Sequence, residues 1–422
     1  MALDMGLGKS IISLSCIQEK GGRALIVCPS SLKYNWQSEI EKFWPEASFH
    51  ICSGQTPDSR ISKFQIVIIN YEIIKFWEQK LSSERFETLV FDESHYVKDK
   101  SSLRSKSAYY LSFYSRNKIL LSGTPIENKP IEIWSQCRII DRQVFPNWLL
   151  FAKKYNGAIK TRWGWKMDKA TNSEELNKIL TEKMMIRVKK EEVLKELPPI
   201  VRKVVPVEID NWKEYREAEK DIINWIKNNN STGLDIEKTK KVEAQVKLDK
   251  LKLIAARGKM SQISEWINQN SPNQKIILFC FHQEILSELS KRIKNCLCVS
   301  QSVKAEQRQK FVEEFQNSED ARVFLTTIKI GGTGFTLTSS SQTVFVQLDW
   351  TPSKHRQAEA RVHRIGQKSK FVSATYFIAR GTVEEKIMKM VDKKAECFSS
   401  AIDGEEAEKE DLLQEILKEY SK

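Results

Sequence analysis

The stretch Thr88-Leu89-Val90-Phe91-Asp92-Glu93-Ser94-His95 joins an apolar run directly to a pair of carboxylates. The run Thr88–Phe91 is short, branched and aromatic, which is typical of a strand buried on both faces of a parallel sheet. In sheets of this kind ligands bind outside the carboxyl ends of the strands, and Asp92 and Glu93 follow such an end. The stretch therefore predicts an α/β protein with an acidic site at one edge of a parallel sheet.

Similar runs recur on both sides of a helix-rich middle, separated by amphipathic segments with helical spacing such as Leu32–Phe43. Alternation of strand and helix implies parallel sheets covered by helices. The other runs are Ala24–Cys28, Gln65–Asn70 and Lys118–Leu121 in the first half, and Lys275–Phe281, Arg322–Thr327, Thr343–Leu348 and Phe371–Ile378 in the second. We place a first α/β lobe at residues 1–140, a helical insertion and linker at 141–257, a second lobe at 258–397 and an acidic helical tail at 398–422.

A glycine-rich segment, Gly6-Leu7-Gly8-Lys9-Ser10, opens a predicted helix close to the start of the chain. Its glycines let backbone N–H groups approach phosphate oxygens, and the helix N-terminus adds a favourable dipole. Its lysine would neutralise the β- and γ-phosphates, and its serine would ligate Mg²⁺. Leu3 stands where the general phosphate-loop pattern has its first glycine, so an ordinary glycine-rich turn is the alternative.

Two further motifs fit the binding of a nucleoside triphosphate. Asp92 would complete the shell of the metal, and Glu93 would polarise the attacking water as a general base, whereas the alternative is that both acids only cap a helix. The run Gln357–Gln367 carries Arg361 and Arg364 three residues apart, on one face of a helix. Such arginines are typical of fingers that stabilise charge on a γ-phosphate, although a solvated basic helix end has the same pattern. Together the motifs predict ATP hydrolysis.

The composition favours an intracellular protein that meets a polyanion. The net charge is +13, and the last twenty residues, 403–422, hold a local balance of −5, which leaves about +18 on the rest. This excess favours nucleic acid, although an ordinary lysine-rich surface fits equally well. The sequence contains no apolar stretch near the roughly 18 residues that span a bilayer. The eight cysteines form no C-x-x-C pair, which indicates buried thiols rather than a zinc site.

The motifs together resemble the Swi/Snf-type branch of the superfamily 2 helicase-like ATPases. The likeness covers nearly the whole chain, in the order and spacing of that family. In chain order the matching segments are Asp4–Ser10 (motif I), Cys28–Leu32 with Trp36 (Ia), Asp92–His95 (II), Leu121–Pro125 (III), Glu191–Pro199 (the inter-lobe signature), Gly331–Phe335 (V) and Gln357–Gln367 (VI). Ser94 and the short insertion look most like the annealing-helicase (HARP-like) subgroup.

This resemblance implies two RecA-like lobes that bind ATP and Mg²⁺ between them and grip DNA on another face. One wall of the nucleotide site would consist of Gly6, Gly8, Lys9, Ser10, Asp92 and Glu93, and the other of Gly334, Gln357, Arg361 and Arg364. The DNA backbone would be contacted by Pro29, Ser30, Ser31, Ser122, Gly123, Thr124, Gly331 and Gly332, for which ordinary turn chemistry is the alternative. We expect His95 and His363 to connect the two sites, and Trp36 to be a core residue.

The function implied by the resemblance is a DNA-dependent ATPase that translocates on double-stranded or forked DNA and remodels DNA structures or DNA-bound proteins. It would be nuclear in a eukaryote and cytoplasmic in a prokaryote or virus. The alternatives are a strand-separating helicase and a non-hydrolysing scaffold.

The family has a first strand and an adenine-contacting segment before motif I, so we expect an upstream segment or another chain to complete the first lobe. The usual arginine pair before the inter-lobe signature is reduced to Arg187-Val188. Neither a membrane nor an oligomer is implied.

Overall fold

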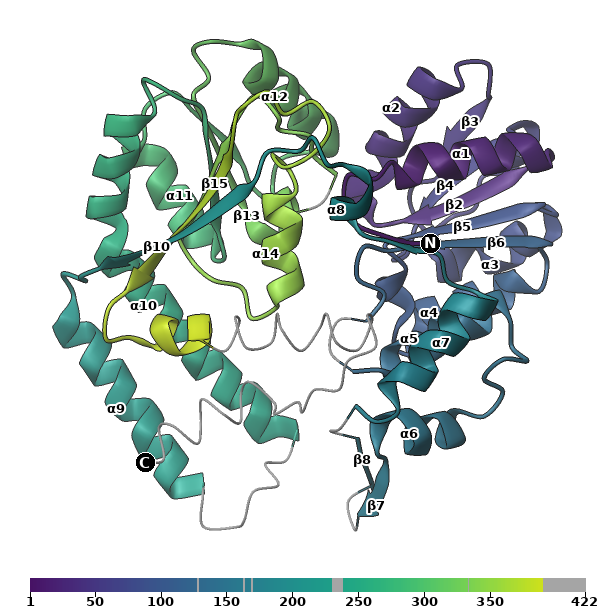
Figure 1. Ribbon diagram of the computed structural model, residues 1–422, viewed down its shortest axis with the longest axis horizontal. Helices are drawn as coiled ribbons and strands as arrows, with labels where there is room; N and C mark the ends of the chain where they lie inside the picture. The colour runs from purple at the N-terminus through teal and green to yellow at the C-terminus, as the bar shows by residue number, and fades with distance from the viewer. Residues whose placement is uncertain (127–128, 162–163, 168–169, 230–237, 333, 390–422) are drawn as a thin grey trace. The chain divides into compact units, whose positions relative to one another are not determined.

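The computed structural model describes residues 1–126, 129–161, 164–167, 170–229, 238–332 and 334–389. These residues form two compact units, of which the first ends at Lys195 and the second begins at Glu196. Each unit is built around its own parallel β-sheet, which confirms the predicted α/β class (Figure 1). The predicted acidic tail at 398–422 lies outside the described residues.

The first unit is organised by five parallel strands. They are β2 (Ala24–Cys28), β3 (Phe49–Ile51), β4 (Ile66–Asn70), β5 (Thr88–Asp92) and β6 (Asn117–Leu121), in the order β3-β4-β2-β5-β6. Its helices include α1 (Lys9–Lys20), α2 (Lys33–Phe43), α3 (Ile74–Ser83) and α4 (Leu103–Ser112), with 3-10 turns at Ser30–Leu32, Ser59–Lys63 and Ser94–Val97. Ile26 and Val90 pack with α1 and α2, whereas Leu25 and Leu89 pack with α3 and α4 on the opposite face. Because both faces are covered, the strands are apolar throughout.

A short strand, β1 (Ala2–Leu3), precedes the glycine-rich segment and pairs in parallel with β9 (Arg187–Val188). On its other side, the Met1 nitrogen donates to Leu120 O at 2.6 Å, and the Ser122 nitrogen donates to Met1 O at 3.1 Å. The segment before the glycines is therefore a strand beside β6, although two residues are too few for a periodic signal in the sequence.

Residues 141–195, which the sequence assigns to a separate helical insertion, are part of the first unit. They contain α6 (Trp148–Asn156), the hairpin β7 (Ile159–Thr161) and β8 (Gly164–Lys166), α7 (Ser173–Lys183) and α8 (Lys190–Val193). Phe151 of α6 and Leu180 of α7 share an apolar cluster with Trp134 and Cys137 of α5 (Ile131–Ile140). Because of this shared core, residues 141–195 do not form a separate domain.

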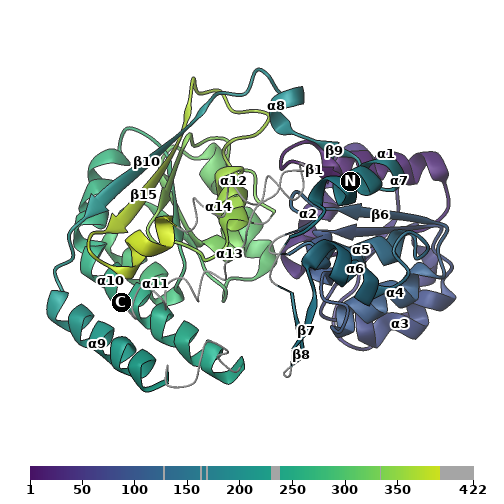
Figure 2. The same cartoon turned by 60° about the horizontal axis from the view of Figure 1, so that its bottom comes forward.

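The second unit contains six parallel strands. They are β10 (Ile200–Val207), β11 (Ile276–Cys280), β12 (Cys296–Val299), β13 (Val323–Thr327), β14 (Gln342–Phe345) and β15 (Val372–Ala379), in the order β10-β15-β14-β11-β13-β12. Its helices are α9 (Trp212–Asn229), α10 (Lys238–Asn270), α11 (Gln283–Arg292), α12 (Ala305–Asn317), α13 (Ile328–Gly331) and α14 (Pro352–Glu359). Figure 2 shows α9 and α10 lying side by side.

The strand β10 differs most from the sequence-based expectation, which places residues 141–257 in helices. It runs in parallel along β15 at the edge of the sheet, and its middle residues are exposed (Figure 1). The exposed pair Arg202-Lys203 and Pro206 hide it from a search for apolar runs. An edge strand tolerates proline because one side of its backbone needs no ladder partner.

The length and polarity of the described helices can be compared with those of a membrane-spanning helix. The longest, α10, carries lysines over most of its length, from Lys238 to Lys259. None of the helices in the described part of the chain combines the length and the apolarity that crossing a membrane requires.

Candidate nucleotide site

The glycine-rich segment forms a loop between β1 and α1, with two glycines in the left-handed backbone region. Gly6 has a φ of 88° and Gly8 a φ of 71°, a region that costs other L-residues about 1–2 kcal/mol. No described atom lies within 4 Å of the position that a Cβ on Gly8 would take, so backbone conformation rather than crowding favours glycine there. Gly8 is the N-cap of α1, whose first N–H groups are thereby available to an anion.

The ammonium of Lys9 folds back onto this loop. Its Nζ donates to the carbonyl oxygens of Leu3 and Asp4 at 2.9 and 3.2 Å. Hydrogen bonds to charged phosphate oxygens are about twice as strong as those to neutral carbonyls, so a phosphate would compete well for this lysine. Ser10 follows in the first turn of α1 and is half-buried.

The carboxylate of Asp4 ties the phosphate loop to the end of the first unit. Its Oδ1 accepts a hydrogen bond from Arg187 Nη1 at 2.7 Å, and its Oδ2 accepts one from the backbone nitrogen of Lys190 at 3.0 Å. Arg187 Nη1 also donates to Ala2 O at 3.0 Å. The single arginine before the inter-lobe signature thus holds the loop against the segment that leads out of the unit.

Asp92 ends β5 and is buried under aromatic side chains. Its Oδ2 accepts from Trp36 Nε1 at 3.0 Å, its Oδ1 accepts from the Glu93 nitrogen at 2.9 Å, and its backbone oxygen accepts from the Tyr71 hydroxyl at 2.8 Å. Burial and the charge of Glu93 raise the pKa of Asp92 to about 6, against the opposing effects of the Trp36 bond and of Lys9. Trp36 is fully buried, as predicted, and it also orients the carboxylate.

Replacing Trp36 with phenylalanine keeps an aromatic ring and removes the indole donor. We expect the pKa of Asp92 to rise further, the free energy of unfolding to fall by about 1.5–3 kcal/mol, and the KM for Mg²⁺ in ATP hydrolysis to increase. The matched control is Trp77→Phe, because Trp77 is equally buried and donates to Gly54 O at 3.0 Å. Equal Mg²⁺ dependence of the two variants would contradict the assigned role.

The raised pKa of Asp92 predicts how stability changes with pH in the absence of nucleotide. The folded pKa of about 6 exceeds the ordinary value of 3.8, so protonation favours the fold, and this contribution is lost as pH rises through 6. Relative to Asp92→Asn, the wild-type free energy of unfolding should therefore increase as pH falls from 7.5 to 4.5, by at most about 3 kcal/mol. Denaturant titrations of both proteins measure this difference, because their shared titrating groups cancel. A difference that shrinks in acid would refute the shift.

Glu93 adopts a strained backbone that turns its carboxylate toward a neighbouring histidine. Its φ of 50° lies in the left-handed region, where strain of about 1–3 kcal/mol is typical of functional sites. His95 Nδ1 lies 3.3 Å from Glu93 Oε2 and 3.5 Å from the Ser122 hydroxyl, which accepts from the Thr124 nitrogen at 3.1 Å. These contacts confirm that His95 connects the acidic box to the Ser122–Thr124 loop.

The predicted DNA-contacting segments of the first unit follow carboxyl ends of adjacent strands. Pro29–Ser31 follows β2 and Ser122–Thr124 follows β6, on either side of β5 with its two acids. Ser30 is exposed, whereas Ser122 is buried. A Cβ on Gly123 would lie 3.1 Å from the Met5 side chain, so this glycine permits close packing against the phosphate loop. Neighbouring loops at one sheet edge are where such a fold binds ligands.

The two predicted arginine fingers lie in the second unit and converge on one backbone oxygen. Arg361 Nη1 and Arg364 Nη1 each donate to Phe335 O at 3.2 Å, and Arg361 Nε donates to Gln357 O at 3.1 Å. The sequence places both arginines on a helix, but α14 ends at Glu359, so the arginines are in the turns that follow it. In these turns the backbone oxygen of Arg361 accepts from the nitrogen of Leu337 at 3.0 Å.

The glycines of the predicted motif V are required by packing. A Cβ on Gly331 would lie 2.3 Å from Thr326 Cγ2, and one on Gly332 would lie 2.6 Å from the backbone oxygen of Ile328. Gly334 has a φ of 80°, which favours glycine for conformational reasons. The DNA contacts assigned to Gly331 and Gly332 stay a prediction, because packing alone accounts for these residues.

Two arrangements in the second unit have no signal in the sequence motifs. Glu359 is buried at the end of α14, where it accepts two hydrogen bonds from Arg202 at 2.8 and 2.7 Å and one from the Tyr376 hydroxyl at 2.8 Å. This network fixes the start of the arginine turns to β10 and β15. His363 Nε2 lies 2.8 Å from Pro198 O, which links motif VI to the inter-lobe signature. The link from His363 to the DNA-facing loops stays a prediction.

The donor set of the first unit fits a magnesium nucleotide. No cluster of three or more His, Cys, Asp or Glu side chains that could hold a metal occurs among the described residues. Mg²⁺ usually binds through one or two protein groups together with substrate phosphates, which matches a serine and one carboxylate beside a phosphate loop. A phosphate loop, a buried aspartate and a strained glutamate at the carboxyl ends of a parallel sheet are the arrangement of a phosphate-loop nucleoside-triphosphate hydrolase.

The family follows from comparison with known domains. The chain belongs to the SNF2-related family, since residues 1–262 match the SNF2-related domain and residues 258–366 match the helicase conserved C-terminal domain. It is a helicase-like ATPase, as the motifs indicated.

Two curated relatives agree with this assignment. The chain is 31% identical to the DNA annealing helicase and endonuclease ZRANB3 of Homo sapiens over 98% of its own length and 40% of that protein. It is 32% identical to the SWI/SNF-related matrix-associated actin-dependent regulator of chromatin subfamily A-like protein 1 homolog of Caenorhabditis elegans, over 93% of its own length and 58% of that protein. The Sulfolobus solfataricus SWI2/SNF2 ATPase core, solved in complex with dsDNA, shares 24% identity at a TM-score of 0.43, over 96% of this chain and 88% of that one. The chain thus spans about half the length of these curated relatives.

Proposed function

We propose that this chain is a DNA-dependent ATPase that moves along double-stranded or forked DNA and remodels DNA structures or DNA-bound proteins. The contact chain from Glu93 through His95 to Ser122 carries the proposal, because it joins the candidate general base to a loop expected on DNA. The names of the relatives support DNA as the partner, although the chain covers only 40% of the human protein.

In the proposed reaction the first unit supplies the phosphate site and the base. Backbone N–H groups of Gly6–Ser10 and the ammonium of Lys9 bind the phosphates. Ser10 and Asp92 would hold Mg²⁺, which would supply positive charge next to the phosphates. Glu93 accepts the proton of the attacking water. The second unit contributes Gly334, Gln357, Arg361 and Arg364.

Motion follows if ATP favours a closed arrangement of the two units and hydrolysis releases it. A ligand shifts such an equilibrium only by its different affinity for the two states, and arginines that bind the γ-phosphate supply that difference. On DNA, Pro29–Ser31, Ser122–Thr124 and Gly331–Gly332 contact phosphates through amides and hydroxyls. Such contacts carry no sequence preference, and the lysines around them make binding sensitive to salt.

The test is phosphate release measured without nucleic acid and with single-stranded, duplex or forked DNA. We expect strong stimulation by duplex or forked DNA, which weakens as salt is raised. Absence of stimulation by any of these DNAs would refute the proposal.

A second measurement separates this function from its alternatives. A translocase displaces the third strand of a triplex and leaves the duplex intact, whereas a strand-separating helicase also displaces one strand of a forked duplex. A non-hydrolysing scaffold would do neither and would bind ATP without releasing phosphate.

A further inference from the structure

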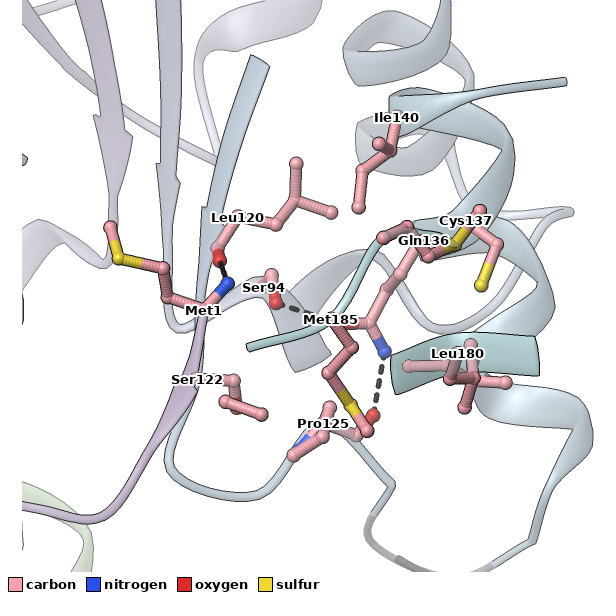
Figure 3. Close-up of a pocket in the computed structure, with 13 residues that line it drawn as sticks. Met1, Ser94, Leu120, Ser122, Pro125, Gln136, Cys137, Ile140, Leu180 and Met185 are labelled. Atoms are coloured by element: carbon pink, nitrogen blue, oxygen red, sulfur yellow. Dashed lines mark hydrogen bonds between the residues drawn. The ribbon is translucent and has the colours of Figure 1, made fainter. Parts of the chain in front are cut away.

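A buried glutamine bridges the acidic box and the Ser122–Pro125 loop. Gln136, on α5, accepts a hydrogen bond from the Ser94 hydroxyl through Oε1 at 2.7 Å. Its Nε2 donates to Pro125 O at 2.6 Å and to Glu132 O at 3.2 Å. Ser94 and Gln136 are each 2% exposed, and Figure 3 shows the two side chains meeting beside Pro125.

The amide group is specifically suited to this bridge. It must present a donor to the carbonyl of Pro125 and an acceptor to the hydroxyl of Ser94, and a glutamine is able to do both. The backbone oxygen of Pro125 accepts only, so the amide cannot reverse without two oxygens facing each other. Both ends are buried, so breaking either bond leaves an unsatisfied polar group that costs about 1–3 kcal/mol.

The bridge provides a second link between the same two segments. Ser94 follows the candidate base Glu93, and Pro125 follows Thr124, whose nitrogen donates to Ser122. The His95–Ser122 contact is one link between these segments, and Gln136 is a second. Two sets of side-chain contacts thus connect the loop to the residues that follow Glu93.

A small pocket lies next to the hydrogen-bonded side chains of Gln136 and Ser94. Gln136, Ser94 and Pro125 line a pocket of about 40 Å³ whose other walls are mainly apolar (Figure 3). These walls include Leu120, Ile133, Cys137, Ile140, Leu180 and Met184. Close-packed interiors resist continuous deformation, whereas a gap beside a hydrogen-bonded group permits a second arrangement.

We propose that Gln136 is a positioning residue that passes the state of the Ser122–Pro125 loop to Glu93, so that DNA on this loop raises ATP turnover. The inference rests on the proposed function. It assigns to Ser94 and Gln136 the role of coupling DNA to hydrolysis, in addition to the contact made by His95.

The test compares Gln136→Met, Ser94→Ala and the double variant with the wild type. Methionine keeps the length of the side chain and removes all three of its hydrogen bonds. Gln143→Met at an exposed position is the matched control. We expect the ratio of DNA-stimulated to DNA-free kcat to fall about five-fold or more in both single variants, with an unchanged KM for ATP. The double variant should be no worse than either single variant, because both break one bridge.

The outcomes separate this inference from the proposed function. If the wild type is stimulated by DNA and the variants retain the same ratio, with only a lower midpoint of thermal unfolding, Gln136 is a packing residue and the inference is wrong. If Gln136→Met does not fold, the smaller Ser94→Ala change decides by the same ratio. A wild type that DNA does not stimulate would overturn the proposed function, and the inference with it.

Discussion

Replacing Glu93 with glutamine is expected to lower ATP turnover by about 10²–10⁴-fold while ATP still binds. The amide keeps the shape of the side chain but cannot take a proton from water. The phosphate loop, including Lys9 and its two glycines, is untouched by this change. Single-turnover phosphate release measures the loss, and equilibrium binding of labelled ATP measures what is retained.

The control for this experiment is Glu41→Gln, which removes the same charge at an exposed position on α2. It should leave both turnover and binding unchanged. If Glu93→Gln retains wild-type turnover, another group is the base, and the strained backbone at residue 93 needs a different explanation. If ATP binding is lost together with turnover, the carboxylate contributes to the nucleotide site itself rather than to proton transfer.

The strands of both sheets were largely predictable from the sequence, because a strand covered on both faces must be apolar throughout. Ala24–Cys28 matches β2 residue for residue, and Thr88–Phe91 is one residue shorter than β5. The strands β10 and β1 escaped prediction for different reasons. The edge strand β10 is exposed along its middle and needs no apolar run, and β1 is defined by backbone pairing rather than by its side chains.

The candidate site could be predicted as a set of motifs, but not as a network. Asp92 and Glu93 were assigned from their place after a strand, which depends on local sequence. Their partners depend on the tertiary fold: Trp36 is 56 positions away from Asp92, and Gln136 is 42 positions away from Ser94. The end of α14 at Glu359 is another such case, since its partner Arg202 lies 157 positions away. Hydrogen bonds between distant segments leave no periodic pattern to detect.

Removal of Arg361 and removal of Arg364 are expected to affect stability differently, although motif VI assigns both arginines the same role. Arg361 is 8% exposed and its guanidinium donates to two backbone oxygens, so removing it costs stability as well as any catalytic role. Arg364 is half-buried, and its Nη1 bonds Phe335 O and the Thr336 hydroxyl, which lies 2.9 Å away. A γ-phosphate offers a charged partner that outcompetes these neutral acceptors. Arg364 is thus the better single test of a finger.

Arg364→Ala should lower ATP turnover by about 10³–10⁵-fold, the range that arginine fingers contribute, with little change in unfolding or in DNA affinity. Arg361→Ala should combine a similar loss with a lower midpoint of thermal unfolding, because the buried carbonyls of Gln357 and Phe335 lose a donor. The exposed Arg380, which pairs with Glu208, provides the control for removing one positive charge from the same unit. Turnover, thermal unfolding and salt-dependent DNA binding are measured on all three variants. If Arg364→Ala weakens DNA binding as much as turnover, the segment after α14 contacts DNA and is no finger; if Arg380→Ala does the same, the effect is only electrostatic.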